Sequence, residues 1–105
     1  MFVHKEQLEY QLSPSDYSSE AMHRAELERL LLPAWHPLAL TDDLAADGDF
    51  RTFDLLGRPL LLRRDGGVIR AYLNVCSHRH CVLTEAARGH SDKLACQYHG
   101  WEYAP

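Results

Sequence analysis

Two short Cys/His motifs near the C-terminal end carry the side chains best suited to chemistry. The first is Cys76-Ser77-His78 and the second is Cys96-Gln97-Tyr98-His99, with 17 residues between them. Each motif offers one thiolate and one imidazole, which are both good ligands for transition metals. Two such loops facing each other would supply two sulfur and two nitrogen ligands to one centre. The two motifs therefore predict a metal site.

Two kinds of centre use two cysteines and two histidines. A two-iron, two-sulfide cluster can take two Cys on one iron and two His on the other, whereas a structural zinc ion takes all four ligands in a tetrahedron. Zinc modules usually pair Cys with Cys and His with His along the chain, but each motif here is mixed. The mixed order favours the iron–sulfur cluster, and zinc is the alternative.

The residues that flank the motifs carry a family resemblance. Cys76-Ser77-His78-Arg79 and Cys96-Gln97-Tyr98-His99-Gly100-Trp101 resemble the two cluster-binding boxes of Rieske proteins. They are most similar to the N-terminal part of the alpha subunit of Rieske non-haem iron (ring-hydroxylating) oxygenases. The similarity covers roughly residues 16–103 and includes Ala25–Arg29, Trp35, Gly48–Phe50 and Leu73–Cys76. The resemblance implies one Rieske [2Fe-2S] cluster per chain, with Cys76 and Cys96 on one iron and His78 and His99 on the other.

Three positions near the motifs indicate the kind of Rieske protein. The members found in quinol-oxidising respiratory complexes carry an extra disulfide between the two loops and a hydroxyl beside the cluster. Cys81 stands where the first extra cysteine would be, but Tyr98 occupies the place of its partner, so we expect Cys81 to be a small buried thiol. Trp101 stands where those members have a serine, the residue that supplies this hydroxyl. With one hydrogen-bond donor fewer, the resemblance implies a reduction potential near the low end of the Rieske range, about −150 mV.

His80 departs from the family pattern, which usually has Gly after the His-Arg pair because the backbone bends tightly there. A histidine fits if its φ is negative, and we expect it to face solvent; the alternative is a protonatable group that tunes the cluster. We expect Arg79 to pair with a carboxylate or a carbonyl, and Trp101 to pack beneath the second loop. The other histidines are expected to be structural or surface residues: His4, His23, His36 and His90.

A helix followed by short strands must position the two motifs. Ser13 and Pro14 predict a helix start, and Pro33 ends the helix because it restricts the residue before it. Strands are predicted at Trp35–Leu40, Phe50–Leu56, Leu60–Arg64 and Val68–Asn74. Two turns are predicted between them, Gly57-Arg58-Pro59 and the hairpin turn Asp65-Gly66-Gly67.

The expected fold is mainly β: a Rieske-type antiparallel β-sandwich preceded by one N-terminal α-helix. We expect a flexible arm over residues 1–14, the helix over 15–33, and the Rieske domain over 34–105. The sandwich is expected to be incomplete at its C-terminus, because Glu102–Pro105 are too short for a strand plus a turn.

Composition narrows the function classes. The chain has 105 residues, of which 46% are hydrophobic and 25% charged, so it is one small globular domain rather than a disordered segment. Its net charge of −4 makes it a poor partner for nucleic acid. It has no apolar run of about 20 residues that could span a membrane, and its first residues lead us to expect no secretory signal. Three cysteines, an odd number, argue against a disulfide framework, and we expect a cytoplasmic protein.

The expected function is one-electron transfer through the cluster. The resemblance implies a reductase or ferredoxin as electron donor, and as acceptor a mononuclear iron held by two histidines and a carboxylate in a C-terminal catalytic domain. The chain lacks that iron site, so we expect no hydroxylation by this chain alone. We expect an incomplete or interrupted alpha subunit, or a chain stabilised as a homo-oligomer. The alternative is a stand-alone Rieske ferredoxin, which the N-terminal helix disfavours.

Overall fold

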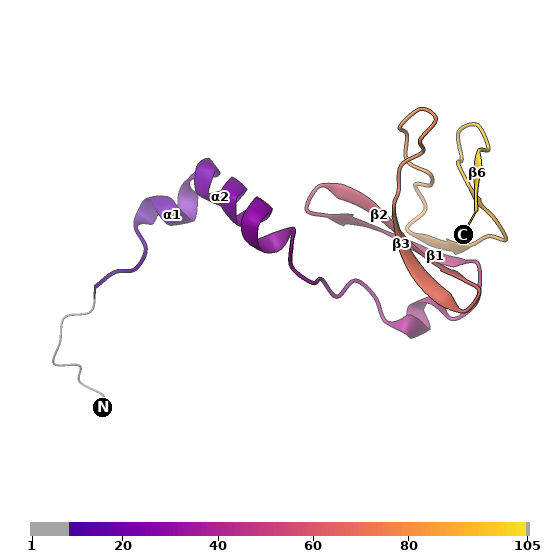
Figure 1. Cartoon of the computed structure of the whole chain (residues 1–105), viewed down its shortest axis with the longest axis horizontal. Helices are drawn as coiled ribbons and strands as arrows, with labels where there is room; N and C mark the ends of the chain where they lie inside the picture. Colours follow the sequence, from indigo (N-terminus) through magenta and orange to yellow (C-terminus); the bar gives the residue numbers. More distant parts are fainter. Residues whose placement is uncertain (1–8, 105) are drawn as a thin grey trace. The chain divides into compact units, whose positions relative to one another are not determined.

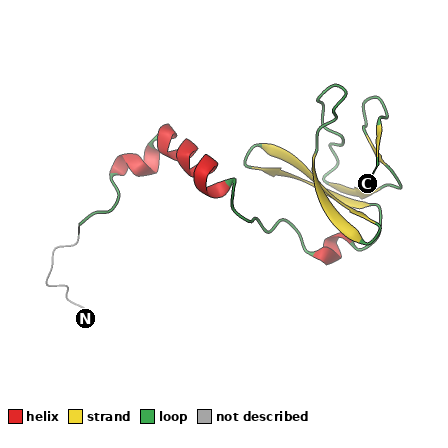
Figure 2. Cartoon of the chain, viewed as in Figure 1, coloured by secondary structure: helices red, strands yellow, loops and turns green. Residues whose placement is uncertain are grey.

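The structure is a computed structural model that describes residues 9–104. It divides the chain into two units, Met1–Trp35 and His36–Pro105. The first unit is helical and the second is built mainly from strands (Figure 2). Residues 1–8 of the expected flexible arm lie outside the described residues.

The first unit contains helix α1 (Pro14–Ser18), helix α2 (Glu20–Glu26) and a π-helical turn, η1 (Leu27–Leu31). The predicted start is confirmed, since α1 begins at Pro14 and Ser13 is its N-cap. The prediction of one continuous helix is wrong, because Ser19 is extended at φ −78° and ψ 129°. The Ser19 hydroxyl accepts a hydrogen bond from the backbone N–H of Met22. Ser19 therefore caps a second helix instead of continuing the first.

The second unit confirms the mainly antiparallel β fold. Four strands form one sheet in the order β3-β2-β1-β4, and their bounds are β1 Asp49–Leu55, β2 Arg58–Asp65, β3 Val68–Leu73 and β4 Arg88–His90. Strands β5 (Leu94–Ala95) and β6 (Glu102–Tyr103) form a two-stranded antiparallel sheet. A short 3₁₀ helix, η2 (Thr41–Leu44), precedes β1.

Two tight turns connect β1, β2 and β3. The predicted hairpin turn is confirmed at Gly66 and Gly67, whose φ values of 58° and 77° are those that a two-residue turn of this hand requires. The turn between β1 and β2 lies at Leu56 and Gly57 rather than at Gly57-Arg58-Pro59. The carboxylate of Asp54 accepts a hydrogen bond from the N–H of Gly57 at 2.9 Å, which stabilises the earlier turn.

Two predictions about strands are wrong. Trp35–Leu40 forms no strand, since Pro37 lacks the N–H that pairing would need. The C-terminal residues, by contrast, do form one: Leu94 pairs with Tyr103 and Ala95 with Glu102. The second Cys/His loop turns the chain back on itself, so that two residues after it suffice for pairing.

Apolar residues are buried in and around the sheet and at the Cys/His loops. Leu44, Leu61 and Leu62 are buried, and Leu61 and Leu62, which are neighbours in strand β2, face opposite sides of the sheet. Cys76, Leu83 and Cys96 form a buried cluster. Within residues 9–104, no helix is long and apolar enough to cross a membrane.

Candidate metal centre

The two Cys/His motifs fold into two loops of the same construction. In the first, the N–H of Cys76 bonds to the carbonyl of Cys81 and the N–H of His80 bonds to the carbonyl of Cys76. In the second, the N–H of Cys96 bonds to the carbonyl of Trp101 and the N–H of Gly100 to the carbonyl of Cys96. Figure 1 shows the loops, orange and yellow, rising next to each other from the strands.

The four predicted ligands come together in two pairs, each of one type. Cys76 and Cys96 are buried at the base of the loops, with 1% and 3% of their surfaces exposed. His78 and His99 are exposed, and their ring centroids are 5.1 Å apart. The structure thus presents thiol beside thiol in the interior and imidazole beside imidazole at the surface.

Tyr103 in strand β6 supplies the main contact to the first thiol. Its hydroxyl lies 2.9 Å from the Sγ of Cys76 and also accepts a hydrogen bond from the N–H of Ser77 at 3.1 Å. The Tyr103 hydroxyl is the main reason that the pKa of Cys76 lies below its usual value, and burial opposes it. Backbone N–H groups of the loop and the Cys96 side chain also lower this pKa. The site therefore favours the thiolate form of Cys76, the form that binds metal.

Cys81 is the third sulfur at the base of the loops. It is a free, half-buried thiol, and its Sγ lies 3.6 Å from the Sγ of Cys96. Burial raises the pKa of Cys81, and Cys96 adds to the increase. Cys81 is therefore the neutral neighbour of the pair formed by Cys76 and Cys96.

Two exposed aromatic residues accompany the imidazoles. The Trp101 ring stacks on the His78 ring, with centroids 4.4 Å apart and planes 6° apart. Tyr98 lies against His99, with centroids 4.0 Å apart. The expectation that Trp101 packs beneath the second loop is therefore wrong: it lies against the first loop and is 49% exposed.

Of the two expectations about the first loop, the exposure of His80 is confirmed and the pairing of Arg79 is not. His80 nevertheless has a φ of 58° rather than the negative value that suits a histidine, because it occupies the place in its loop that Gly100, with φ 73°, occupies in the other. This left-handed conformation is costly for a residue with a Cβ. The side chain of Arg79 is exposed and makes no hydrogen bond or ion pair with a residue of the described part of the chain.

Residues outside the motifs hold the loops in place, and the sequence analysis assigned them no such role. The Asn74 side chain donates to the carbonyl of Thr84 at 2.9 Å and accepts from its N–H at 3.2 Å, which closes the base of the first loop. The N–H of Gln97 donates to the carbonyl of Leu83 and joins the second loop to the first. In the sequence, the role of Asn74 in holding the loop was indicated only by its position directly after strand β3 and two residues before Cys76.

A second network fixes strand β2 against the chain that leads to the second loop. The buried guanidinium of Arg63 donates to both carboxylate oxygens of Asp65 at 2.9 Å and to the hydroxyl of Ser91 at 2.9 Å. Next to it, His90 Nδ1 lies 2.9 Å from the carboxylate of Asp49. These contacts hold the segments that carry the loops. They add no further metal-binding side chain to the four predicted ligands.

The donor set fits a two-iron cluster better than a single ion. Among residues 9–104, no group of three or more His, Cys, Asp or Glu side chains is arranged to hold one metal ion. One tetrahedral zinc ion would need all four donors around it. A mixed two-iron, two-sulfide cluster needs one pair of donors at each iron, and the structure presents a pair of thiols and a pair of imidazoles.

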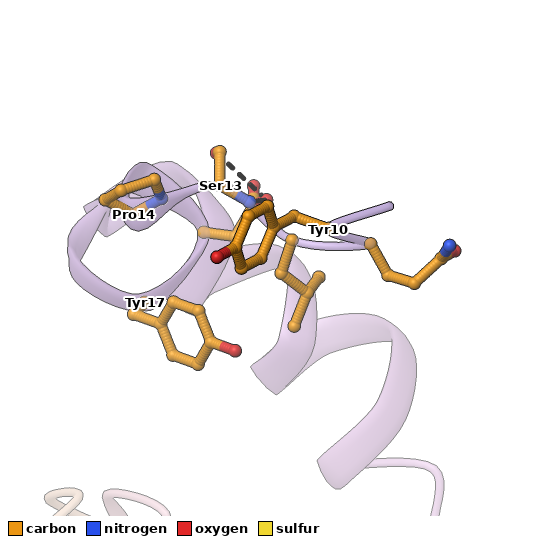
Figure 3. Close-up of a pocket in the computed structure, with 7 residues that line it drawn as sticks. Tyr10, Ser13, Pro14 and Tyr17 are labelled. Atoms are coloured by element: carbon orange, nitrogen blue, oxygen red, sulfur yellow. Dashed lines mark hydrogen bonds between the residues drawn. The ribbon is translucent and has the colours of Figure 1, made fainter. Parts of the chain in front are cut away.

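A hollow of the first unit offers no such chemistry. Figure 3 shows it between the rings of Tyr10 and Tyr17, next to the hydrogen-bonded Ser13. Its lining residues include neither Cys nor His: Tyr10, Gln11, Leu12, Ser13, Pro14, Asp16 and Tyr17.

Comparison with known proteins places these loops in context. The sequence model of the Rieske [2Fe-2S] domain matches residues 34–105. The alpha subunit of biphenyl 2,3-dioxygenase from Rhodococcus jostii (strain RHA1) is 34% identical over 93 residues, which are 88% of this chain and 20% of that protein. The chloroplastic choline monooxygenase of Spinacia oleracea is 33% identical over 88 residues, 83% of this chain and 20% of that protein.

A solved structure agrees with these sequence relatives. The quaternary ammonium Rieske monooxygenase CntA, in complex with its substrate L-carnitine, is similar with a TM-score of 0.79 and 28% identity, over 85% of this chain and 26% of that one. The chain therefore spans about a fifth of the length of the curated relatives it matches. The names of these three proteins mention different substrates, one of them an aromatic hydrocarbon and two of them quaternary amines.

Proposed function

The chain belongs to the Rieske [2Fe-2S] domain family, and on that premise we propose that it transfers electrons one at a time as the N-terminal part of a Rieske oxygenase alpha subunit. The observation that carries the proposal is the sorting of donors in two like loops, with buried thiols side by side and exposed imidazoles 5.1 Å apart. When bound, a Rieske cluster takes up and releases one electron.

We propose that Cys76 and Cys96 bind the inner iron, and that His78 and His99 bind the outer iron. Two thiolates in a buried position need hydrogen-bond donors to offset their charge. Tyr103 and the backbone of the first loop supply such donors to Cys76. These groups favour the charged form of the first sulfur and restrict its direction.

The imidazoles are the proposed route for electrons. His78 and His99 are exposed, and each has an aromatic ring against it, Trp101 and Tyr98 respectively. A partner can therefore approach this edge closely without any opening of the fold. We propose a reductase or ferredoxin as the donor and a mononuclear-iron catalytic domain, in the same subunit or a neighbouring copy, as the acceptor.

An oxygenase origin is favoured over a stand-alone ferredoxin. The match to the biphenyl dioxygenase alpha subunit covers 93 residues, more than the span 34–105 that the Rieske domain occupies. The similarity therefore includes part of the helical unit.

We also propose the cytoplasm as the compartment. All three cysteines are free thiols, and a reducing compartment keeps thiols in this form.

The proposal is tested by spectroscopy of the full chain, reconstituted with iron and sulfide without oxygen and reduced with dithionite. We expect equal amounts of iron and sulfide, two of each per chain, and a rhombic Rieske-type EPR signal. Cys76→Ser and His99→Ala should lose the signal. The matched controls Cys81→Ser and His90→Ala should keep it. Stoichiometric zinc without sulfide, or an intact signal in His99→Ala, would refute the proposed ligands.

A further inference from the structure

Cys81 stands apart from the proposed ligands, yet it is very close to one of them. Its Sγ lies 3.6 Å from the Sγ of Cys96, although 15 residues separate the two along the chain. A disulfide has an S–S distance of about 2.05 Å, so the two sulfurs must move closer before they can bond. The structure thus places a pair of free thiols where one covalent bond would join the two loops.

The backbone around this pair is held on both sides. The carbonyl of Cys81 accepts from the N–H of Cys76 at 2.7 Å, and the carbonyl of Leu83 accepts from the N–H of Gln97 at 2.9 Å. The side chain of Gln97 also accepts from the N–H of Glu85 at 3.3 Å. These bonds fix the residues beside Cys81 against those beside Cys96. The two thiols therefore meet because of the fold and not because of a chance side-chain orientation.

The other possible pairings are less favoured. The Sγ of Cys76 is already engaged by the Tyr103 hydroxyl at 2.9 Å. Cys81 is the more accessible partner, since it is half-buried whereas Cys76 and Cys96 are buried. An oxidant from solvent would therefore reach Cys81 first.

We propose that Cys81 and Cys96 form an intramolecular disulfide when the chain carries no cluster and meets a small-molecule disulfide such as oxidised glutathione. Cys81, the most accessible of the three thiols, loses its proton to solvent and attacks the oxidant, which forms a mixed disulfide and releases one small thiolate that takes up a proton. Cys96 then attacks the sulfur of Cys81 and releases the second small thiol. The two protein thiols lose two electrons and two protons, and the oxidant gains them as its two thiols.

The disulfide would exclude the cluster. This consequence rests on the proposed function, in which Cys96 is a ligand, because a sulfur in a disulfide has no thiolate to offer iron. The cluster-free chain would be stored with its loops joined and its ligand thiol protected from further oxidation. Reduction by a dithiol would be required before the cluster could be assembled.

The sequence allows a direct test by mass spectrometry. Trypsin cleaves after Arg70, Arg79, Arg88 and Lys93, so each cysteine falls in a different peptide: 71–79, 80–88 and 94–105. The full chain is freed of metal, treated with oxidised glutathione without oxygen, alkylated and digested. We expect peptides 80–88 and 94–105 to be linked, lighter by two hydrogen atoms, and peptide 71–79 to be alkylated.

Variants and a denatured control separate geometry from general thiol reactivity. Cys76→Ser should keep the link, whereas Cys81→Ser should give only glutathione adducts. In concentrated urea the same treatment should distribute the bonds among all three pairings. A link from 71–79 to 94–105 as the main product, or three alkylated cysteines with excess oxidant, would overturn the proposal.

A second readout distinguishes this proposal from the ligand assignment. The disulfide-linked chain is offered iron and sulfide before and after reduction with a dithiol. We expect cluster assembly only after reduction. If the linked chain assembles a cluster while the disulfide persists, the disulfide is established but Cys96 is not a ligand.

Discussion

The hydroxyl of Tyr103 lies 2.9 Å from the Sγ of Cys76, and 27 residues separate the two along the chain. The contact exists because strand β6 pairs with β5 and so carries Tyr103 under the first loop. Trp101 lacks the hydroxyl that the high-potential members carry beside the cluster, but the Tyr103 hydroxyl is a donor next to the proposed ligand Cys76. The reduction potential should therefore depend on this tyrosine.

Tyr103→Phe should lower the reduction potential of the reconstituted chain. An ordinary hydrogen bond contributes about 1 kcal/mol, which corresponds to about 40 mV for a one-electron couple. Loss of the donor leaves more negative charge on the sulfur and disfavours the added electron. Protein-film voltammetry measures the change. Tyr72→Phe is the matched control, since the buried hydroxyl of Tyr72 has no hydrogen-bond partner among the described residues. An equal shift of the potential in both variants would show that the contact between Tyr103 and Cys76 is not its cause.

His78→Cys should lower the potential further or abolish the cluster, because it adds a thiolate to the outer iron. All-cysteine clusters of the plant type lie near −400 mV, whereas Rieske clusters lie between about −150 and +300 mV. EPR and voltammetry of the reconstituted variant report both outcomes. The control is His23→Cys, on helix α2 of the other unit. An unchanged Rieske spectrum in His78→Cys would contradict the ligand role of His78.

His80→Gly should stabilise the chain. His80 has a φ of 58°, and a left-handed conformation costs an L-residue roughly 1–2 kcal/mol that glycine does not bear. Part of the gain is offset by the greater freedom of glycine in the unfolded chain, so we expect an increase of about 0.5–1 kcal/mol in the free energy of unfolding in urea. Arg79→Gly, one residue earlier and without a left-handed φ, should instead decrease it. A destabilised His80→Gly would mean that the imidazole itself makes a needed contact.

Asp49 should make stability depend on pH in the acid range. The N–H of Ala46 is the main cause that holds the pKa of Asp49 below 3.8, and the side chain of His90 adds to it. The folded chain therefore binds the Asp49 proton less readily than the unfolded chain. This stabilising contribution is present above pH 3.8 and is lost as pH falls through the lower pKa of the folded state.

Urea unfolding between about pH 2 and pH 5 tests this dependence. Asp49→Asn should flatten the acid limb of the stability curve, because its side chain cannot take up the proton. Asp92→Asn is the control, since Asp92 is 99% exposed and lies 3.8 Å from the other nitrogen of His90. Identical acid limbs in the wild type and Asp49→Asn would show that another group causes the loss.

Much of the site could be predicted from the order of residues alone. The spacing of the Cys and His residues predicted the four proposed ligands, since each motif is local and places one Cys and one His in the same short loop. The glycine pair at 66–67 predicted its hairpin for the same reason, because positive φ at both central positions is a local property. Local steric rules act within four or five residues, so a single sequence reveals them.

Only the tertiary structure decided the contacts between distant segments. Three contacts join residues from separate segments of the chain: the stacking of Trp101 on His78, the Tyr103 hydroxyl at Cys76 and the 3.6 Å approach of Cys81 to Cys96. The left-handed φ of His80 likewise follows from the shape of the whole loop, which overrides the preference of its residue. Such contacts depend on strand pairing and packing, since no local rule states which side chains two separate loops will bring together.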